Sequence, residues 1–329
     1  MHKLALALCA CLCLLLLSGQ STQAAGERRM VTISAGQEGG VYYPAAGILC
    51  RLLHLESERH GIRCAVDRSR GSVENVENLA YGRSDIGIVQ TDVQYAAING
   101  EYRYDTALPV AGQLRSLVSL HPEPITVVTR LDAQVNEFAD LAGKRVNVGE
   151  VGSGTFSTAS ALMQAYGLSS SDLRRQLNWG ASEAATALCE NRIDAMILVV
   201  GHPNSTVRRV SESCAVRLVS IGGAVADKLL TLKPFFSKAI IGANTYVGQE
   251  QDVLSLGVRA SVLTTQDLPF ETAYEITRAV MLNHERLQAL HPAFSLLEPR
   301  QMVQGNTAPW HPGALKFLNE QGLLVNQSN

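Results

Sequence analysis

Four short segments are rich in Gly, Ser, Thr or Gln, the residue types that hold small anions. They are residues 36–43, 69–72, 90–92 and 152–155. Each lies where an apolar run of strand length gives way to a helical pattern, so we expect four strand-to-helix turns. Glycine lets a ligand approach the backbone, and free N–H groups at a helix start attract negative charge. Helix capping alone uses the same residues, but four such turns together favour a cleft for a small anion.

Motifs of the common enzyme classes are missing from the sequence. The Gly143-Lys144 pair lacks the upstream glycine of a phosphate-binding P-loop, and neither a G-x-S-x-G elbow nor an H-E-x-x-H helix occurs. His54 and His60 lie six residues apart, which does not put both rings on one helix face. We therefore predict no catalytic residues, no metal site and no cofactor. An enzyme built on the same architecture is the alternative, and it would need a nucleophile or base in the cleft.

Charge and composition narrow the class of protein further. The 329 residues include 28 basic and 30 acidic side chains, giving a formal charge of −2, and 46% are hydrophobic. This balance argues against a nucleic-acid-binding protein and provides ample material for a core. The length predicts about two domains.

The N-terminus has the pattern of a secretory signal peptide. Lys3 precedes an apolar run over residues 4–17, and small residues follow up to Ala24 and Ala25. The run is shorter than the roughly 20 residues of a spanning helix. We expect residues 1–25 to be removed near Ala24 or Ala25, leaving a periplasmic protein that does not itself span the membrane.

Four cysteines remain after this cleavage: Cys50, Cys64, Cys189 and Cys214. An even number in an oxidising compartment favours disulfides, and four cysteines allow three pairings. We predict Cys50 with Cys64 and Cys189 with Cys214, since each bridge would tie a helix to a following strand. Four buried free thiols are the alternative.

Strands and helices alternate along the mature chain, which predicts an α/β fold with a parallel or mixed sheet. A first series ends near residue 120, and a strand over residues 125–129 follows Pro122 and Pro124. A second series runs to about residue 244. The first lobe is expected to contain residues 27–120 and about 245–329, and the second lobe residues 121–244. The expected helices include residues 41–58 and 269–290.

Six motifs in this chain resemble those of the TAXI family, the solute-binding subunits of tripartite ATP-independent periplasmic (TRAP) transporters. In chain order they are Gly39-Gly40-Val41-Tyr42-Tyr43-Pro44, Gly71-Ser72-Val73-Glu74-Asn75, Asp85-Ile86-Gly87 with Gln90-Thr91-Asp92, Gly152-Ser153-Gly154-Thr155, Arg192-Ile193-Asp194-Ala195 and His311-Pro312-Gly313-Ala314. They span essentially the whole mature chain.

The resemblance implies a two-lobed, type II-like periplasmic binding protein with a hinge, and no enzymatic activity. Such a receptor binds an organic anion or amino acid (glutamate, glutamine or a dicarboxylate such as 2-oxoglutarate) and delivers it to a TRAP membrane permease. The ligand contacts that it implies are Gly40, Val41, Tyr42, Ser72, Gln90, Thr91, Ser153, Gly154, Thr155 and Gly201.

Two charged residues depart from the family pattern. Glu38 stands in a loop that is usually uncharged, and Arg70 stands where a small or neutral residue is common. We hypothesise that Arg70 pairs with a ligand carboxylate and Glu38 with a ligand ammonium group, which would favour glutamate over 2-oxoglutarate. Alternatively, both side chains point to solvent.

Two other functions fit the same sequence features. One is a ligand-sensing periplasmic module for a signalling partner, and the other is a surface antigen or adhesin without a ligand. The glycine-rich turns argue against an adhesin.

Overall fold

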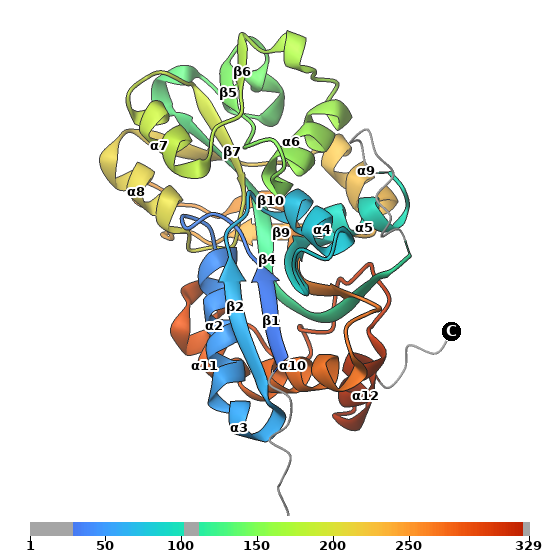
Figure 1. Cartoon of the computed structure of the whole chain (residues 1–329). Helices are drawn as coiled ribbons and strands as arrows, with labels where there is room; N and C mark the ends of the chain where they lie inside the picture. Colours follow the sequence, from blue (N-terminus) through green and yellow to red (C-terminus); the bar gives the residue numbers. More distant parts are fainter. Residues whose placement is uncertain (1–28, 102–111, 325–329) are drawn as a thin grey trace, which may run out of the picture.

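The computed structural model describes residues 29–101 and 112–324. Its elements form two α/β lobes connected by two long strands (Figure 1). Lobe 1, at the bottom of the view, contains β1 (Arg29–Ser34), α2 (Tyr42–Leu55), α3 (Ser57–His60), β2 (Ile62–Asp67), α4 (Ser72–Ala80), β3 (Ile86–Gln90), α5 (Thr91–Ile98), α10 (Phe270–Leu282), α11 (His284–Leu290), the 3₁₀ helix η4 (Pro292–Phe294) and α12 (Pro312–Glu320).

Lobe 2 lies above it in the same view. It contains the 3₁₀ helices η1 (Leu131–Ala133), η2 (Phe138–Leu141) and η3 (Ser170–Asp172), the strands β5 (Arg145–Asn147), β6 (Arg175–Leu177), β7 (Ala195–Val199), β8 (Val216–Val219) and β9 (Ser237–Ile241), and the helices α6 (Gly154–Ala165), α7 (Ala181–Cys189), α8 (Ser205–Ser213) and α9 (Ala224–Leu232).

Two strands, β4 (Leu114–Arg130) and β10 (Val253–Thr265), run from one lobe to the other. They pair antiparallel with each other and join the strands into the order β2-β1-β3-β10-β4-β7-β5-β6, with β8 added to β4 and β9 to β10. Pro122 and Pro124 do not interrupt β4, although each lacks a backbone donor. They lie where β4 crosses between the lobes, and the pairing with β10 shifts register after Arg259. This crossing is the natural hinge.

The parallel strands of each lobe direct their carboxyl ends toward the other lobe. In lobe 1, β1 is parallel to both β2 and β3, and in lobe 2, β5 is parallel to both β6 and β7. Ligands of open α/β sheets bind beyond these ends. The turns that follow β1, β3 and β5 therefore face the boundary between the lobes.

Separate hydrophobic clusters stabilise the two lobes. Phe294 and Phe317, from the C-terminal region, pack in the lobe 1 cluster. Tyr246, Val253 and Val258 pack instead with lobe 2. We therefore propose to place the second crossing near residue 259, later in the chain than the predicted position of about residue 245.

Both predicted disulfides are confirmed. Cys50 of α2 is bonded to Cys64 of β2, with Cα atoms 5.1 Å apart. Cys189 at the end of α7 is bonded to Cys214, which follows α8, with Cα atoms 5.4 Å apart. The first bridge ties a helix to the next strand, as expected, and the second ties the ends of two adjacent helices.

Two predicted long helices are each divided in the structure. The helix expected over residues 41–58 ends at Leu55, because Glu56 leaves the helical conformation with φ −112° and ψ 13°. The helix expected over residues 269–290 is divided at Asn283, whose side-chain amide donates to the Ala279 carbonyl 2.8 Å away. Such side-chain bonds to the backbone compete with continued helix formation.

The predicted signal peptide, residues 1–25, lies outside the described residues. Within residues 29–101 and 112–324, none of the helices has the length and apolar character needed to cross a membrane.

Candidate functional site

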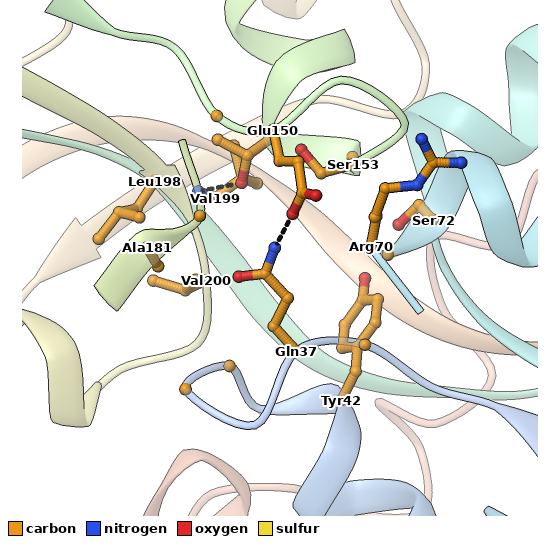
Figure 2. Close-up of a pocket in the computed structure, with 18 of the residues that line it drawn as sticks. Gln37, Tyr42, Arg70, Ser72, Glu150, Ser153, Ala181, Leu198, Val199 and Val200 are labelled. Carbon is orange, nitrogen blue, oxygen red and sulfur yellow. Dashed lines mark hydrogen bonds between the residues drawn. The ribbon is translucent and has the colours of Figure 1, made fainter. Parts of the chain in front are cut away.

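A cavity of about 90 Å³ lies between the lobes and is lined from both sides (Figure 2). Four helices begin at it: α2 and α4 of lobe 1 and α6 and α7 of lobe 2. The first N–H groups of a helix have no partner within the helix, and the helix dipole adds about half a positive charge at that end. The cavity therefore favours negatively charged groups on a ligand.

In lobe 1, Gln90 and Ser72 line the cavity with polar groups next to the start of α4. The Ser72 hydroxyl accepts a hydrogen bond from the Gln90 backbone N–H at 3.0 Å and lies 3.4 Å from the Gln90 side-chain oxygen. Gln90 is buried, and its side-chain nitrogen Nε2 has no hydrogen-bond partner among the described residues. An unpaired buried donor costs free energy, so this amide is suited to bind a ligand oxygen.

In lobe 2, the loop after β5 brings Ser153 to the start of α6. Its hydroxyl accepts from the Phe156 N–H at 3.1 Å and so caps the helix. Thr155 accepts from the Val199 N–H at 3.2 Å, which ties α6 to β7 (Figure 2). The side-chain oxygen of Asn147 accepts a hydrogen bond from the backbone N–H of Trp179 at 2.8 Å. This bond positions the loop before α7, which carries the Trp179 indole, on the cavity wall.

The starts of α4 and α6 lie directly against each other, because both contain glycine at the contact. A Cβ atom on Gly154 would lie 1.4 Å from the Gln90 side-chain oxygen and 2.7 Å from the Ser72 hydroxyl. A larger residue would therefore have to displace the Gln90 side chain and the Ser72 hydroxyl. Two helix N-termini and one free amide converge at this point, which gives the cavity its strongest anion-binding position.

Arg70 lies at the edge of the cavity and is already paired. Its Nε lies 2.7 Å from the Glu74 carboxylate, and its Nη1 donates to the Val151 carbonyl of lobe 2 at 3.3 Å. The hydrogen bond to Glu74 raises the pKa of Arg70. The guanidinium thus connects the lobes while its charge is balanced within α4.

Two carboxylates line the cavity interior. Glu150 of lobe 2 accepts a hydrogen bond from the Gln37 side-chain amide of lobe 1 (Figure 2). Glu123 of β4 accepts from the Tyr42 hydroxyl at 2.7 Å and lies 3.6 Å from Nε2 of His121. Burial, together with the charge of Glu123, raises the pKa of Tyr42 well above its ordinary value. Its phenol therefore remains protonated and continues to donate.

Direct hydrogen bonds hold the lobes together around this cavity. The Glu74 N–H donates to the Gly152 carbonyl at 3.1 Å, and the Thr206 hydroxyl donates to the Gly39 carbonyl at 3.4 Å. Thr158 of α6 donates to the buried carboxylate of Asp92 on α5. Burial raises the pKa of Asp92 to about 6. The structure is therefore a closed arrangement of the two lobes.

The structure brings together all but three of the residues that the sequence nominated for the ligand site, the exceptions being Thr91, Gly201 and Glu38. Those lining the cavity are Gly40, Val41, Tyr42, Arg70, Ser72, Gln90, Ser153, Gly154 and Thr155. Thr91 lies beneath it, where its hydroxyl accepts from the Arg259 N–H at 3.1 Å. Gly201 packs on His121 behind the wall, where a Cβ atom would lie 2.3 Å from the imidazole.

Glu38 does not line this cavity. Its carboxylate pairs with Arg68 at 3.2 Å, both side chains are 63% exposed, and they border a wider hollow outside the cavity. The hypothesis of an ammonium contact through Glu38 therefore fails on position. Solvent and a neighbouring guanidinium satisfy this carboxylate instead.

Several lining residues were not expected from the sequence: Gln37, Glu123, Asn147, Glu150 and Trp179. Glu150 lies two residues before the glycine-rich turn at residues 152–155, so extending that motif by two residues would have found it. Glu123 carries a different signal, an acidic residue between two prolines within an apolar strand.

Metal binding finds no support in the described part of the chain, where no group of three or more His, Cys, Asp or Glu side chains could hold an ion.

Comparisons with known proteins agree with this architecture. A model of the NMT1-like family matches residues 33–322. A solved structure from Bordetella bronchiseptica RB50 is 14% identical, with a TM-score of 0.55, over 91% of this chain and 91% of that chain. A Listeria monocytogenes protein described as an L-cystine ABC transporter is 12% identical, with a TM-score of 0.51, over 84% of this chain and 99% of that one.

The periplasmic aliphatic sulphonate binding protein SsuA from Escherichia coli is 14% identical, with a TM-score of 0.47, over 88% of this chain and 78% of that one. At these identities the likeness concerns the fold alone. The family match covers most of the sequence, and the chain belongs to the NMT1-like family.

Proposed function

We propose that this protein is a periplasmic solute receptor that binds a small organic anion or amino acid between its lobes and delivers it to a TRAP membrane permease. The observation that carries the proposal is the convergence of four helix N-termini, two from each lobe, on one cavity beside the unpaired amide of Gln90. The ligand contacts in this proposal are the backbone at residues 40–42, the side chains of Ser72 and Gln90, and the turn at residues 153–155.

The size of the cavity supports a small ligand. A volume of about 90 Å³ corresponds to roughly six to nine water-sized units. This suits a four- or five-carbon acid such as glutamate, glutamine or 2-oxoglutarate, and it is too small for an oligosaccharide or a peptide of several residues.

The hinge and the interlobe contacts suggest how a receptor signals occupancy. A ligand held by both α4 and α6 stabilises the closed arrangement, because it binds that arrangement better than an open one. Closure also brings the α2–α4 side of lobe 1 and the α6–α8 side of lobe 2 into one continuous surface. We propose that the permease recognises this surface, after export of the chain and removal of residues 1–25.

A thermal-shift screen of the mature protein tests the binding step. The protein is unfolded, stripped of bound ligand, refolded, and mixed with glutamate, glutamine, 2-oxoglutarate, four-carbon dicarboxylates or sugars. At a hundredfold excess over the dissociation constant, a true ligand adds about 2.7 kcal/mol to the free energy of unfolding. We expect a rise of several degrees in Tm with one carboxylate or amino acid and none with sugars.

The delivery step needs a separate test. Proteoliposomes that contain a TRAP permease should take up the radiolabelled ligand only when this protein is added in its liganded form. Uptake that does not depend on the added protein would contradict the permease assignment while leaving ligand binding intact.

A further inference from the structure

The carboxylates of Glu123 and Glu150 line the cavity without a strongly basic partner. Within residues 29–101 and 112–324, no lysine or arginine nitrogen lies within 4.0 Å of either carboxylate. The groups closest to them are uncharged or weakly basic: the Gln37 amide at Glu150, and the Tyr42 phenol and His121 ring at Glu123. Glu123 is buried and Glu150 is half-buried, and a carboxylate withdrawn from water without a cation is costly, so a cationic ligand group would be stabilised here.

The guanidinium of Arg70 acts on Glu150 only at a distance, because the charge of Glu150 contributes to the raised pKa of Arg70 while no ion pair within 4.0 Å joins the two side chains. It is held by Glu74 at 2.7 Å, and its outer nitrogen is engaged by the Val151 carbonyl. In Figure 2 it lies to one side, whereas the Glu150 carboxylate extends toward Gln37 in the middle of the view. A ligand with two carboxylates would therefore meet two further carboxylates and only one cation, which is already paired.

The two cavity carboxylates differ in how strongly their hydrogen-bond partners hold them. Glu123 has a phenol on one oxygen and an imidazole beside the other, and it lies buried in the hinge strand β4. Glu150 is held by a single neutral amide, which comes from the opposite lobe. A side-chain amide on a glycine-flanked loop can be displaced at little cost, because a charged donor forms the stronger hydrogen bond to a carboxylate.

Resting on the proposed receptor function, we infer that Glu150 is the specificity-determining residue of the cavity and selects ligands that carry an ammonium group as well as a carboxylate. The ligand ammonium replaces the Gln37 amide at Glu150, and the ligand carboxylate lies at the facing starts of α4 and α6 with the free Gln90 amide. The cavity then accepts amino acids and rejects the corresponding acids without nitrogen. Gln37 holds Glu150 in place until the ligand arrives.

The test compares ligand pairs that differ only in the ammonium group. Isothermal titration of ligand-stripped protein measures the dissociation constants of glutamate against glutarate, and of glutamine against glutaramate. Four proteins are titrated: wild type, Glu150→Gln, Glu123→Gln at the second cavity carboxylate, and Glu183→Gln as a matched control. Glu183 borders the hollow outside the cavity and does not line the cavity itself.

The inference predicts that wild type prefers one amino acid over its partner acid by at least about 100-fold, the size expected for a buried charge pair. Glu150→Gln should weaken the binding of that amino acid by about 100-fold and change the dissociation constant of the partner acid by less than about threefold. Glu183→Gln should retain the wild-type preference. Circular dichroism melts of Glu150→Gln, Glu123→Gln and Glu183→Gln confirm that each variant folds.

Three results would overturn the inference and leave the receptor function intact. The first is equal wild-type affinity for both members of a pair, and the second is an equal loss of affinity for both members in Glu150→Gln. The third is loss of discrimination between the members in Glu123→Gln but not in Glu150→Gln. If wild type binds no ligand of either pair but binds 2-oxoglutarate or a four-carbon dicarboxylate, the inference also fails and the receptor function stands. If it binds none of these compounds, the proposed function fails as well.

Discussion

The Thr158 hydroxyl of lobe 2 donates a hydrogen bond to the carboxylate of Asp92 in lobe 1, and the other carboxylate oxygen of Asp92 is buried without a partner among the described residues. This contact joins α5 to α6 beside the cavity. A buried carboxylate with one unpaired oxygen lowers the free energy of unfolding. It makes closure of the lobes sensitive to protonation.

We expect the free energy of unfolding of the closed protein to decrease as the pH rises from about 4 to about 6, because of Asp92. Burial raises the pKa of Asp92 to about 6 in the structure, whereas the exposed group has its ordinary value of 3.8. In this range the closed state binds more protons than the unfolded state, so the contribution of Asp92 to the free energy of unfolding decreases as pH rises. Above pH 6 the ionised group costs about 3 kcal/mol.

Asp92→Asn isolates this effect, because the amide keeps the shape and removes the charge. The Tm of the variant should exceed that of wild type by several degrees at pH 7.5, and the difference should shrink at pH 4.5. Differential scanning calorimetry at both pH values provides the measurement. A Tm difference that is the same at both pH values would contradict the role assigned to Asp92.

Gly154→Ala should weaken ligand binding, because the added Cβ would lie 1.4 Å from the Gln90 side-chain oxygen and would displace the amide that is proposed to bind the ligand. Overpacking of this kind costs about 1–3 kcal/mol, which corresponds to roughly a ten- to hundredfold loss of affinity if closure carries it. Isothermal titration with the best ligand measures it. Gly47→Ala on α2 is the control, since a Cβ there meets no atom within 4 Å. Equal affinity of both variants would refute the close-contact argument.

Both disulfides should stabilise the mature protein. The bridges close loops with sequence separations of 14 and 25 residues, for which loop entropy predicts about 3 kcal/mol each. We expect the double variants Cys50→Ala/Cys64→Ala and Cys189→Ala/Cys214→Ala each to melt several degrees below wild type. Thiol titration of denatured, unreduced wild type should find no free thiol in the mature chain. Detection of free thiols would contradict the bridges.

The parts of the site that the sequence predicts are those determined locally. Ser153 caps α6, and Ser72 and Gly154 are the first residues of α4 and α6, positions that are determined by the immediate neighbours in the chain. The disulfides follow the same logic, because their cysteines are only 14 and 25 residues apart in the chain. The alternation of strands and helices likewise predicts the α/β fold and two lobes.

The parts that escaped prediction depend on contacts between distant segments. Glu123 reaches the cavity because β4 continues through two prolines and pairs with Val258 of β10 at the hinge. Trp179 reaches it because Asn147, more than thirty residues earlier in the chain, holds its backbone. Glu38 and Glu150 both border glycine-rich turns, and only the packing of the lobes shows that Glu150 faces the cavity.

The central claim is that a small carboxylate-bearing ligand binds between the lobes. A crystal structure of the mature protein with the best ligand from the thermal-shift screen tests it most directly. The account predicts the ligand carboxylate within hydrogen-bond distance of the backbone amides that start α6 and of the free Gln90 amide. A ligand seated outside this cavity, or one that touches a single lobe only, would contradict it.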